Sequence, residues 1–370
     1  GYVLNSRAGF AQCATAVIEQ QDAKVQRNEM SAMMQQADKY RLNKEVLPYF
    51  KDYDLKNIDY FLIEGFINKL GKDKLTPPTI SNYVGLVRKI LSYAQRKGFI
   101  QAVPQIPKVK KVDAPRGWFT PREYYQLWKC AGALVGETWE VRQWINDKGE
   151  KETFVCERQT EQPKRATKLS KKMAASKLLR RVHMTAEIYN LIVFMKNSFI
   201  RPTDIKWMQH KHVEAISGEH TYLRLTLPTS KKHDKPIVTM EKAVAVYERQ
   251  RALHNSGDKK QNNAKPEDYV FVPEYADKEK RGSALTCLQR QFGVVLKKVG
   301  LEKGARGEER SLYSLRHTCI MYRLLYGDGV DLLTLARNAR TSPEMIDRFY
   351  ASHLEGEMNI GLLQSRRGKK

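Results

Sequence analysis

Three short segments in the second half of the chain contain residues that could bind and attack a phosphodiester. Arg201 lies in SFIRPTDIKWM, Arg316 in SLYSLRHTCIMYRLL, and Tyr350 in LLTLARNARTSPEMIDRFYASHL. Arginine suits a phosphate clamp because its planar guanidinium stays charged and can donate two hydrogen bonds to one phosphate. A tyrosine hydroxyl can form a covalent phosphate ester, which splits one difficult displacement into two easier steps. The sequence therefore offers two candidate anion clamps and a candidate nucleophile.

The charge balance favours a nucleic acid as the partner of such a site. Lys and Arg total 65 against 41 Asp and Glu, a formal net charge of +24. This excess causes self-repulsion unless a polyanion neutralises it, so nucleic acid is favoured over a membrane surface or a ribosomal context. The five cysteines are scattered without CxxC spacing, which favours reduced thiols over a zinc site or a disulfide framework. No apolar run or signal peptide indicates a membrane or secreted protein, and we expect a cytoplasmic one.

Helical spacing of apolar residues predicts that the first hundred residues form a helical bundle. Two such stretches lie around Tyr40–Phe50 and Ile58–Leu70. A third begins after the predicted N-cap Thr76, with prolines in its first turn, and ends at Gly98. Taken alone, these stripes indicate a hydrophobic core and no chemistry.

A basic segment without helical spacing follows the bundle. Residues 104–116 contain three prolines, which favour an extended linker. Its lysines Lys108, Lys110 and Lys111 are suitably placed to contact phosphates, although a solvated loop is the alternative. We expect four parts along the chain: a helical DNA-binding domain over 1–103, a linker over 104–117, a second domain over 118–355 and a tail over 356–370.

The second domain is predicted to combine helices with a small antiparallel β-sheet. Thr120 and Glu123 form a capping box for a helix that ends at Leu134. Further helices are expected over 186–199, 241–255, 284–298, 315–326, 330–338 and 343–350, and strands over 222–227 and 237–240. The chain is therefore predicted to be mainly α.

Residues 139–185 are predicted to be an insertion in this second domain. Its first part alternates like a hairpin around Asp147–Gly149. The basic stretch Lys164–Arg181 follows, for which a DNA-facing arm and a solvated charged surface are both open.

In their order along the chain, these motifs resemble those of the tyrosine recombinases, the family that includes the phage integrases. Its motifs are Arg-x-x-Glu, a hairpin lysine, His-x-x-Arg-His, and a small-residue turn with His or Trp nine residues before a Tyr. The resemblance covers the second domain and, more loosely, the first, which resembles the family's core-binding domain. It implies a helical core-binding domain, a mixed α/β catalytic domain, and site-specific DNA recombination.

The resemblance also implies a role for each matching residue. Arg201 and Arg316 match the two phosphate-clamping arginines, and Asp204 matches the acidic residue that steadies the first of them. Tyr350 matches the nucleophile. His317 matches the histidine after the second arginine, which helps to position the tyrosine or the phosphate.

The family's hairpin lysine protonates the leaving 5′ oxygen. In this chain it corresponds to Lys231 or Lys232, within the turn Thr229–Lys235. We prefer Lys231, because Lys235 and the strand Ile237–Val238 then lie at the family's spacing. Lys232 is then expected to contact the DNA.

Two positions depart from the family's motifs. Tyr313 stands where the family has His, and a phenol can donate to phosphate but accepts protons poorly at neutral pH. Thr341 stands where the family has His or Trp. Both departures leave open a DNA-binding architectural or regulatory relative that has lost catalysis. A relaxing topoisomerase or a telomere resolvase, which share the catalytic core, is the other alternative.

The resemblance finally implies how the reaction and its partners are organised. Tyrosine attack gives a 3′-phosphotyrosyl link, and a 5′ hydroxyl from a second duplex reverses the step without a metal or other cofactor. The implied partner is double-stranded DNA, with four protomers on two sites. We expect a bacterial or phage-encoded protein of a mobile genetic element.

Overall fold

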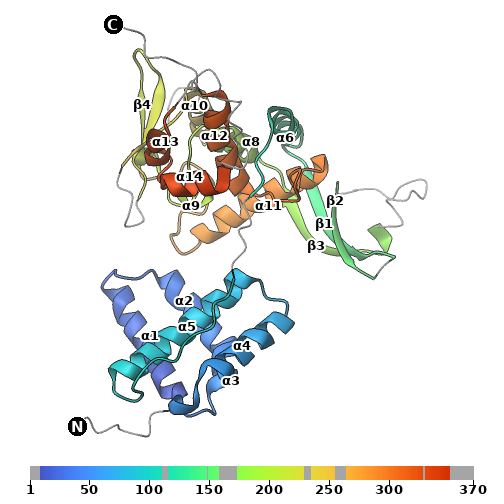
Figure 1. Ribbon diagram of the computed structural model, residues 1–370. Coiled ribbons are helices and arrows are strands. Elements are labelled where there is room, and N and C mark those ends of the chain that lie inside the picture. Colours follow the sequence, from blue (N-terminus) through green and yellow to red (C-terminus); the bar gives the residue numbers. More distant parts are fainter. Residues whose placement is uncertain are drawn as a thin grey trace, which may run out of the picture. The chain divides into compact units, whose positions relative to one another are not determined.

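The computed structural model describes residues 9–110, 116–147, 149–157, 173–228, 235–254, 264–327 and 330–350. The chain divides into two compact units, Gly1–Asp113 and Ala114–Lys370 (Figure 1). None of the described helices is long and apolar enough to cross a membrane. All five cysteines are free thiols.

The regular elements in the described part of the first unit are all helices, as the apolar spacing predicts. Its elements are α1 (Phe10–Gln26), α2 (Ala32–Arg41), the π-helical turn η1 (Leu42–Val46), α3 (Leu47–Phe50), the 3-10 turn η2 (Leu55–Asn57), α4 (Tyr60–Lys72) and α5 (Pro77–Arg96). The start of α5 differs from the prediction in one detail. Thr76 is the N-cap residue, but its hydroxyl hydrogen-bonds the Thr79 hydroxyl at 2.9 Å and caps no backbone N–H.

Aromatic rings and one buried carboxylate hold this unit together. Phe50 stacks on Phe10 with ring centroids 5.1 Å apart and meets Phe66 edge-on at 5.0 Å. The Asp38 carboxylate of α2 accepts from Lys89 of α5 at 2.7 Å. Because these contacts join residues far apart in the sequence, they fix how the helices cross.

The segment that follows α5 packs against the helices of the first unit. Val103, Ile106 and Val109 lie against its hydrophobic core, while Lys108 and Lys110 are exposed. The apolar residues therefore anchor residues 103–109 to the bundle and leave these two lysines accessible to solvent.

The second unit contains both helices and strands. Its elements are α6 (Pro121–Ala133), β1 (Thr138–Ile145), β2 (Lys151–Glu157), β3 (Lys177–His183), α8 (Ala186–Lys196), α9 (Pro202–Ile205), the 3-10 turn η3 (His210–His212), β4 (Val213–Ile216), β5 (Tyr222–Leu225), β6 (Ile237–Val238), α10 (Lys242–Leu253), α11 (Arg281–Val299), α12 (Leu312–Tyr326), α13 (Leu332–Asn338) and α14 (Pro343–Tyr350). The strands form two antiparallel sheets, in the orders β2-β1-β3 and β4-β5-β6.

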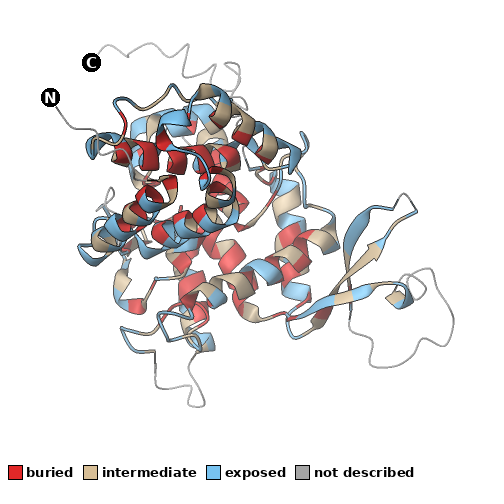
Figure 2. Ribbon diagram, turned by 90° about the horizontal axis from the view of Figure 1, so that it is seen from below, coloured by how far each residue is buried: buried red, intermediate tan, exposed pale blue. Residues whose placement is uncertain are grey.

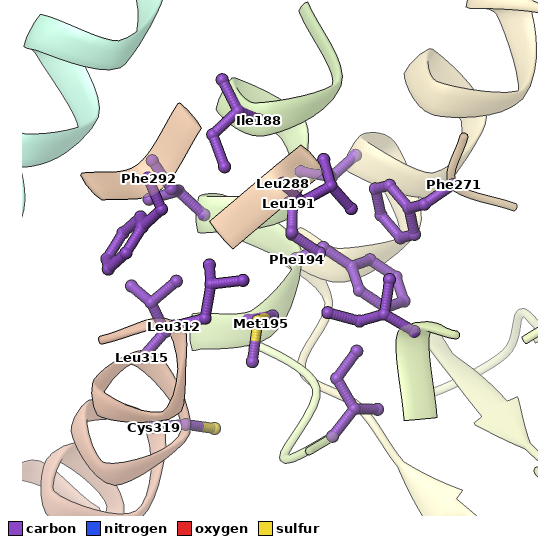
Figure 3. Packing of buried hydrophobic residues seen from close by; sticks show 14 of the residues in the cluster. Ile188, Leu191, Phe194, Met195, Phe271, Leu288, Phe292, Leu312, Leu315 and Cys319 are labelled. Carbon is purple, nitrogen blue, oxygen red and sulfur yellow. The ribbon is translucent and has the colours of Figure 1, made fainter. Parts of the chain in front are cut away.

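Helix α8 lies at the centre of the core of this unit. Its apolar side chains meet those of α11 and α12 (Figure 3), namely Ile188, Leu191, Phe194, Met195, Leu288, Phe292, Leu312, Leu315 and Cys319. Phe194 also meets Phe271, with ring centroids 5.7 Å apart. The core thus holds α12, which contains Arg316, against the helix that leads into Arg201.

Part of the predicted basic arm is a strand. Residues 177–183 form β3, which pairs with β1 at Trp139 and Val182, whereas 158–172 lie outside the described residues. Glu140 of β1 is buried and accepts from Arg142 at 2.5 Å and from Arg181 at 3.1 Å. Burial would raise the pKa of Glu140, but these two guanidinium groups outweigh it and lower that pKa. Arg181 therefore has a structural partner, although most residues of β2 and β3 are exposed (Figure 2).

A fully buried arginine ties the loop after α10 to the segment after α9. The guanidinium of Arg281 donates to the carbonyls of Val272 at 2.7 Å, Phe271 at 3.0 Å and Lys206 at 2.9 Å. It also lies over the Tyr269 ring, 3.9 Å from the centroid. Burial lowers the pKa of Arg281. These bonds immobilise the turn that directly follows the helix headed by Arg201.

Candidate active site

Local backbone geometry fixes Arg201 at the start of α9. Its backbone is extended, with φ −85° and ψ 154°, and Pro202 occupies the first helical position. The Asp204 carboxylate accepts from the Arg201 N–H at 2.8 Å. Asp204 therefore supports Arg201 through the backbone, as an N3 residue of a short helix does.

Arg316 lies on the second turn of α12 and is more deeply buried than Arg201. Its side chain is 2% exposed. The guanidinium donates to the carbonyl oxygens of Phe199 and Ala339. Arg316 thus joins α12 to two turns that lie 117 and 23 residues away in the sequence.

One of these two turns also holds Arg201. Its guanidinium donates to the carbonyl of Arg340. Phe199 and Arg340 both have left-handed backbones, with φ of 55° and 52°. Such a conformation costs on the order of 1–3 kcal/mol for residues other than glycine, and it concentrates at functional sites. Each of these left-handed residues turns its carbonyl toward one of the two arginines, so the turns bring Arg201 and Arg316 together.

Thr341 lies directly after this left-handed residue. Its N–H donates to the Ala336 carbonyl at 3.0 Å and closes the C-terminus of α13. The Thr341 side chain is half-buried beside the buried Arg340. Thr341 therefore directly follows the two residues whose carbonyls accept from the arginines.

Tyr313 and His317 form a ring pair on α12. Their centroids are 5.1 Å apart, with an interplanar angle of 55°. Burial lowers the pKa of His317 to about 3, assisted by the charges of Arg316 and Arg116. At neutral pH His317 is therefore an uncharged imidazole, which can donate one hydrogen bond and accept another.

Arg116 was not predicted as a site residue. Two backbone bonds attach the residues after it to α12 and its preceding loop: Gly117 N–H donates to the Glu309 carbonyl at 3.3 Å, and Phe119 N–H to the Thr318 hydroxyl at 3.0 Å. Arg116 is exposed, and its charge acts on the neighbouring His317. The only signal for Arg116 in the sequence is its place at the end of a basic segment.

Three of the predicted site residues lie outside the described residues. Lys231 and Lys232 fall within residues 229–234, and Lys111 within 111–115. Tyr350 is the last residue of α14, whose backbone alone is described at that position. Helix α14 follows the Arg340 turn closely and is anchored by Ile346, which is 1% exposed. Nowhere in the described ranges do three or more His, Cys, Asp or Glu side chains gather as a metal site would require.

Comparisons with known proteins concern the fold of the chain. Residues 16–110 match the family model of the phage integrase SAM-like domain. Comparison with curated proteins gives no significant match.

Three solved structures are similar over nearly the whole chain. A Tn1549 transposon integrase in complex with transposon right end DNA has 14% identity and a TM-score of 0.60, covering 96% of this chain and 99% of that one. A lambda integrase dimer bound to a COC′ core site has 10% identity and a TM-score of 0.56, covering 96% of both chains. A lambda integrase tetramer bound to a Holliday junction has 11% identity and a TM-score of 0.59, covering 93% and 78%. At these identities the similarity concerns the fold, and it confirms the predicted fold class.

Proposed function

We propose that this chain, whose fold is that of the tyrosine recombinases and whose residues 16–110 match a phage integrase SAM-like domain, is a site-specific DNA recombinase. The main support is that Arg201 and Arg316 both donate to the turn at Ala339 and Arg340, which lies shortly before the helix that ends at Tyr350. The net charge of +24 suits a DNA substrate. The similar integrases were also solved on DNA.

The two arginines are suited to hold the phosphate that is cut. A guanidinium has five N–H donors, so bonds to carbonyls can orient it while others face the substrate. A phosphate oxygen also forms stronger, charge-assisted hydrogen bonds than a neutral carbonyl does. Because the carbonyls of Phe199, Ala339 and Arg340 are fixed by the turns, Arg201 and Arg316 need little rearrangement when DNA binds.

The remaining residues complete a transesterification. The Tyr350 oxygen forms a bond to phosphorus while the bond from phosphorus to the 5′ oxygen breaks. The phenol releases its proton to solvent water, and Lys231 supplies one to the departing oxygen. A 5′ hydroxyl from a partner duplex then attacks the 3′-phosphotyrosyl link and releases Tyr350. Neutral His317 positions the phosphate or the nucleophile by hydrogen bonding.

Strand exchange requires more than one protomer, because each protomer supplies one Tyr350. We propose four protomers on two duplex sites, a state in which lambda integrase was solved on a Holliday junction. Lys108, Lys110, Lys111 and Lys232 are then expected to contact the DNA backbone.

Joint-molecule formation tests the proposal. Two labelled duplexes taken from the DNA that flanks the gene are incubated with the protein, and recombinant strands are resolved on a denaturing gel. A recombinase gives strands that contain both labels. A topoisomerase or telomere resolvase would cut and reseal a single duplex without joining the two. A DNA-binding relative without catalysis would give a shifted complex and no new strand.

A further inference from the structure

A second candidate ligand site lies between three helices of the second unit. A pocket of about 350 Å³ opens between α6, α8 and α10. Its walls combine three aromatic side chains with three basic ones: Tyr124, Trp128, Tyr189, Lys196, Lys242 and Arg249. Among the residues whose side chains the structure describes, Arg201, Arg316 and Tyr313 do not line it.

The aromatic wall of this pocket is held in place. The rings of Trp128 and Tyr189 lie 5.7 Å apart, with an interplanar angle of 33°. The guanidinium of Arg249 covers Tyr189, 4.9 Å from its centroid. Gly132 of α6 packs so closely that an added Cβ would lie 3.2 Å from the Tyr189 ring. The Tyr189 ring is therefore confined between three neighbours.

Among the described residues that line the pocket, no carboxylate pairs with its basic side chains. Lys196 is half-buried, and its ammonium lies 5.5 Å from the Tyr124 centroid and 4.8 Å from that of Tyr322. Burial is the main cause that lowers the pKa of Lys196. The Nε of Arg249 donates to the amide oxygen of Asn190 at 2.6 Å, a neutral acceptor that does not offset the charge of the guanidinium.

The acidic residues of the three helices point to other partners or to solvent. Glu123 of α6 pairs with Arg310 at 2.8 Å, and Glu187 of α8 pairs with His254 at 3.0 Å. Glu248 of α10 is exposed and does not line the pocket. The described residues thus give the pocket an excess of positive charge, which an anionic ligand would offset.

We propose that this pocket binds a nucleotide, with its base on the aromatic wall and its phosphate at Lys196, Lys242 and Arg249. Stacking on aromatic side chains accommodates any base, because every base has a π-face. The volume lies in the range of small-molecule sites, which combine apolar walls with a few polar groups. The nucleotide comes either from solution or from an unpaired position of bound DNA.

Fluorescence of Trp128 provides a direct test on the full chain. Titration with dAMP should quench the emission saturably, because the base stacks beside the indole. Deoxyadenosine, which lacks the phosphate, should bind about tenfold more weakly or worse. The double variant Lys242→Gln, Arg249→Gln should weaken dAMP binding at least as much. Lys129→Gln removes an exposed charge from α6 outside the pocket and should change nothing.

Two further variants show whether dAMP binds in this pocket or at the cleavage site. Trp128→Phe should abolish most of the signal, while equilibrium dialysis still detects bound dAMP. Arg201→Gln should leave the quenching intact, and loss of quenching there would place the nucleotide at the cleavage site and overturn the proposal.

The pocket proposal also fails if dAMP gives no saturable change, if inorganic phosphate quenches as dAMP does, or if Lys129→Gln weakens binding as the double variant does. An oligonucleotide with one unpaired base that competes better than dAMP identifies DNA as the source, and the reverse order identifies a free nucleotide. Because no strand is cut in these measurements, their failure would leave the proposed recombinase function untouched.

Discussion

The neutral, buried His317 predicts that mild acid destabilises the second unit. The pKa of His317 is about 3 in the folded protein, against an ordinary value of 6.5. Lowering the pH below 6.5 therefore protonates His317 in the unfolded chain, while the imidazole stays neutral in the folded protein. The unfolded state gains protons first, so the free energy of unfolding falls as the pH falls, and the loss ends near the folded pKa.

The expected loss in the free energy of unfolding follows from the interval between the pKa values of His317 in the folded and unfolded states. Each pH unit contributes about 1.4 kcal/mol, so His317 accounts for a loss of about 2 kcal/mol between pH 7 and pH 5. His210 behaves in the same way, because burial lowers its pKa to about 4, and it contributes a similar loss. The His210 ring hydrogen-bonds the Tyr247 hydroxyl at 2.9 Å and is not one of the predicted site residues, and so it provides a matched comparison.

Denaturant unfolding monitored at pH 7, 6 and 5 measures this effect. The wild-type protein should lose about 4 kcal/mol from the two histidines over this interval. His317→Gln and His210→Gln should each lose about half as much, because glutamine does not titrate. If His317→Gln keeps the full pH dependence of the wild type, His317 is already charged or exposed in the folded state. Its assignment as a neutral partner of Tyr313 and the phosphate would then be wrong.

Three further predictions concern DNA binding and cleavage. Arg116→Gln should weaken DNA binding and lower the slope of log K against log salt by about 0.9, the effect of one lost phosphate contact. If the slope is unchanged and equal to that of the exposed control Arg122→Gln, Arg116 does not contact a DNA phosphate. Lys231→Ala should slow cleavage by about 10²–10⁴, the usual contribution of a general acid, and a substrate with a 5′-bridging sulfur should restore the rate. If Lys232→Ala shows this rescued defect and Lys231→Ala does not, the general acid is Lys232. Finally, EDTA should leave cleavage unchanged, because arginines neutralise the phosphate. Activity lost in EDTA and restored by magnesium would show that a metal takes part.

The sequence predicted elements best where a capping signal coincided with apolar spacing. In α6 the Thr120 hydroxyl accepts from the Glu123 N–H at 3.3 Å, and the Glu123 carboxylate accepts from the Thr120 N–H at 2.9 Å. This capping box starts the helix where it was expected. Helix α14 also spans the residues predicted for it, 343–350. Local hydrogen bonds decide both starts, and local sequence is sufficient to reveal them.

Strand pairing was less predictable, because it depends on distant partners. Residues 177–181 were predicted to belong to a basic stretch that forms either a DNA-facing arm or a solvated surface, yet 177–183 form β3 beside β1, where Val182 and Glu140 supply buried contacts. The short strand β4, Val213–Ile216, has too few residues for alternation to be visible and was missed. Its partner β5 provides the register.

The arrangement of the candidate site was only partly accessible from the sequence. Motif order placed Arg201 and Arg316 at helix starts, as observed. It could not show that their guanidinium groups bind carbonyls of Phe199, Ala339 and Arg340, since backbone acceptors have no residue signature. The left-handed backbone of the two turns was equally invisible, because the residues there are not glycines.

The covalent intermediate tests the assignment of Tyr350 as the nucleophile most directly. The protein is incubated with a nicked suicide substrate, whose cleaved fragment diffuses away and prevents resealing, and the products are separated on a denaturing gel. Wild-type protein should give a protein–DNA band that resists denaturation, with its phosphate linked to Tyr350 in a peptide digest. Tyr350→Phe should give no such band while binding the same DNA nearly as well, since only a hydroxyl is lost. A covalent band that persists in Tyr350→Phe, or its absence from the wild type on a cognate site, would contradict this assignment.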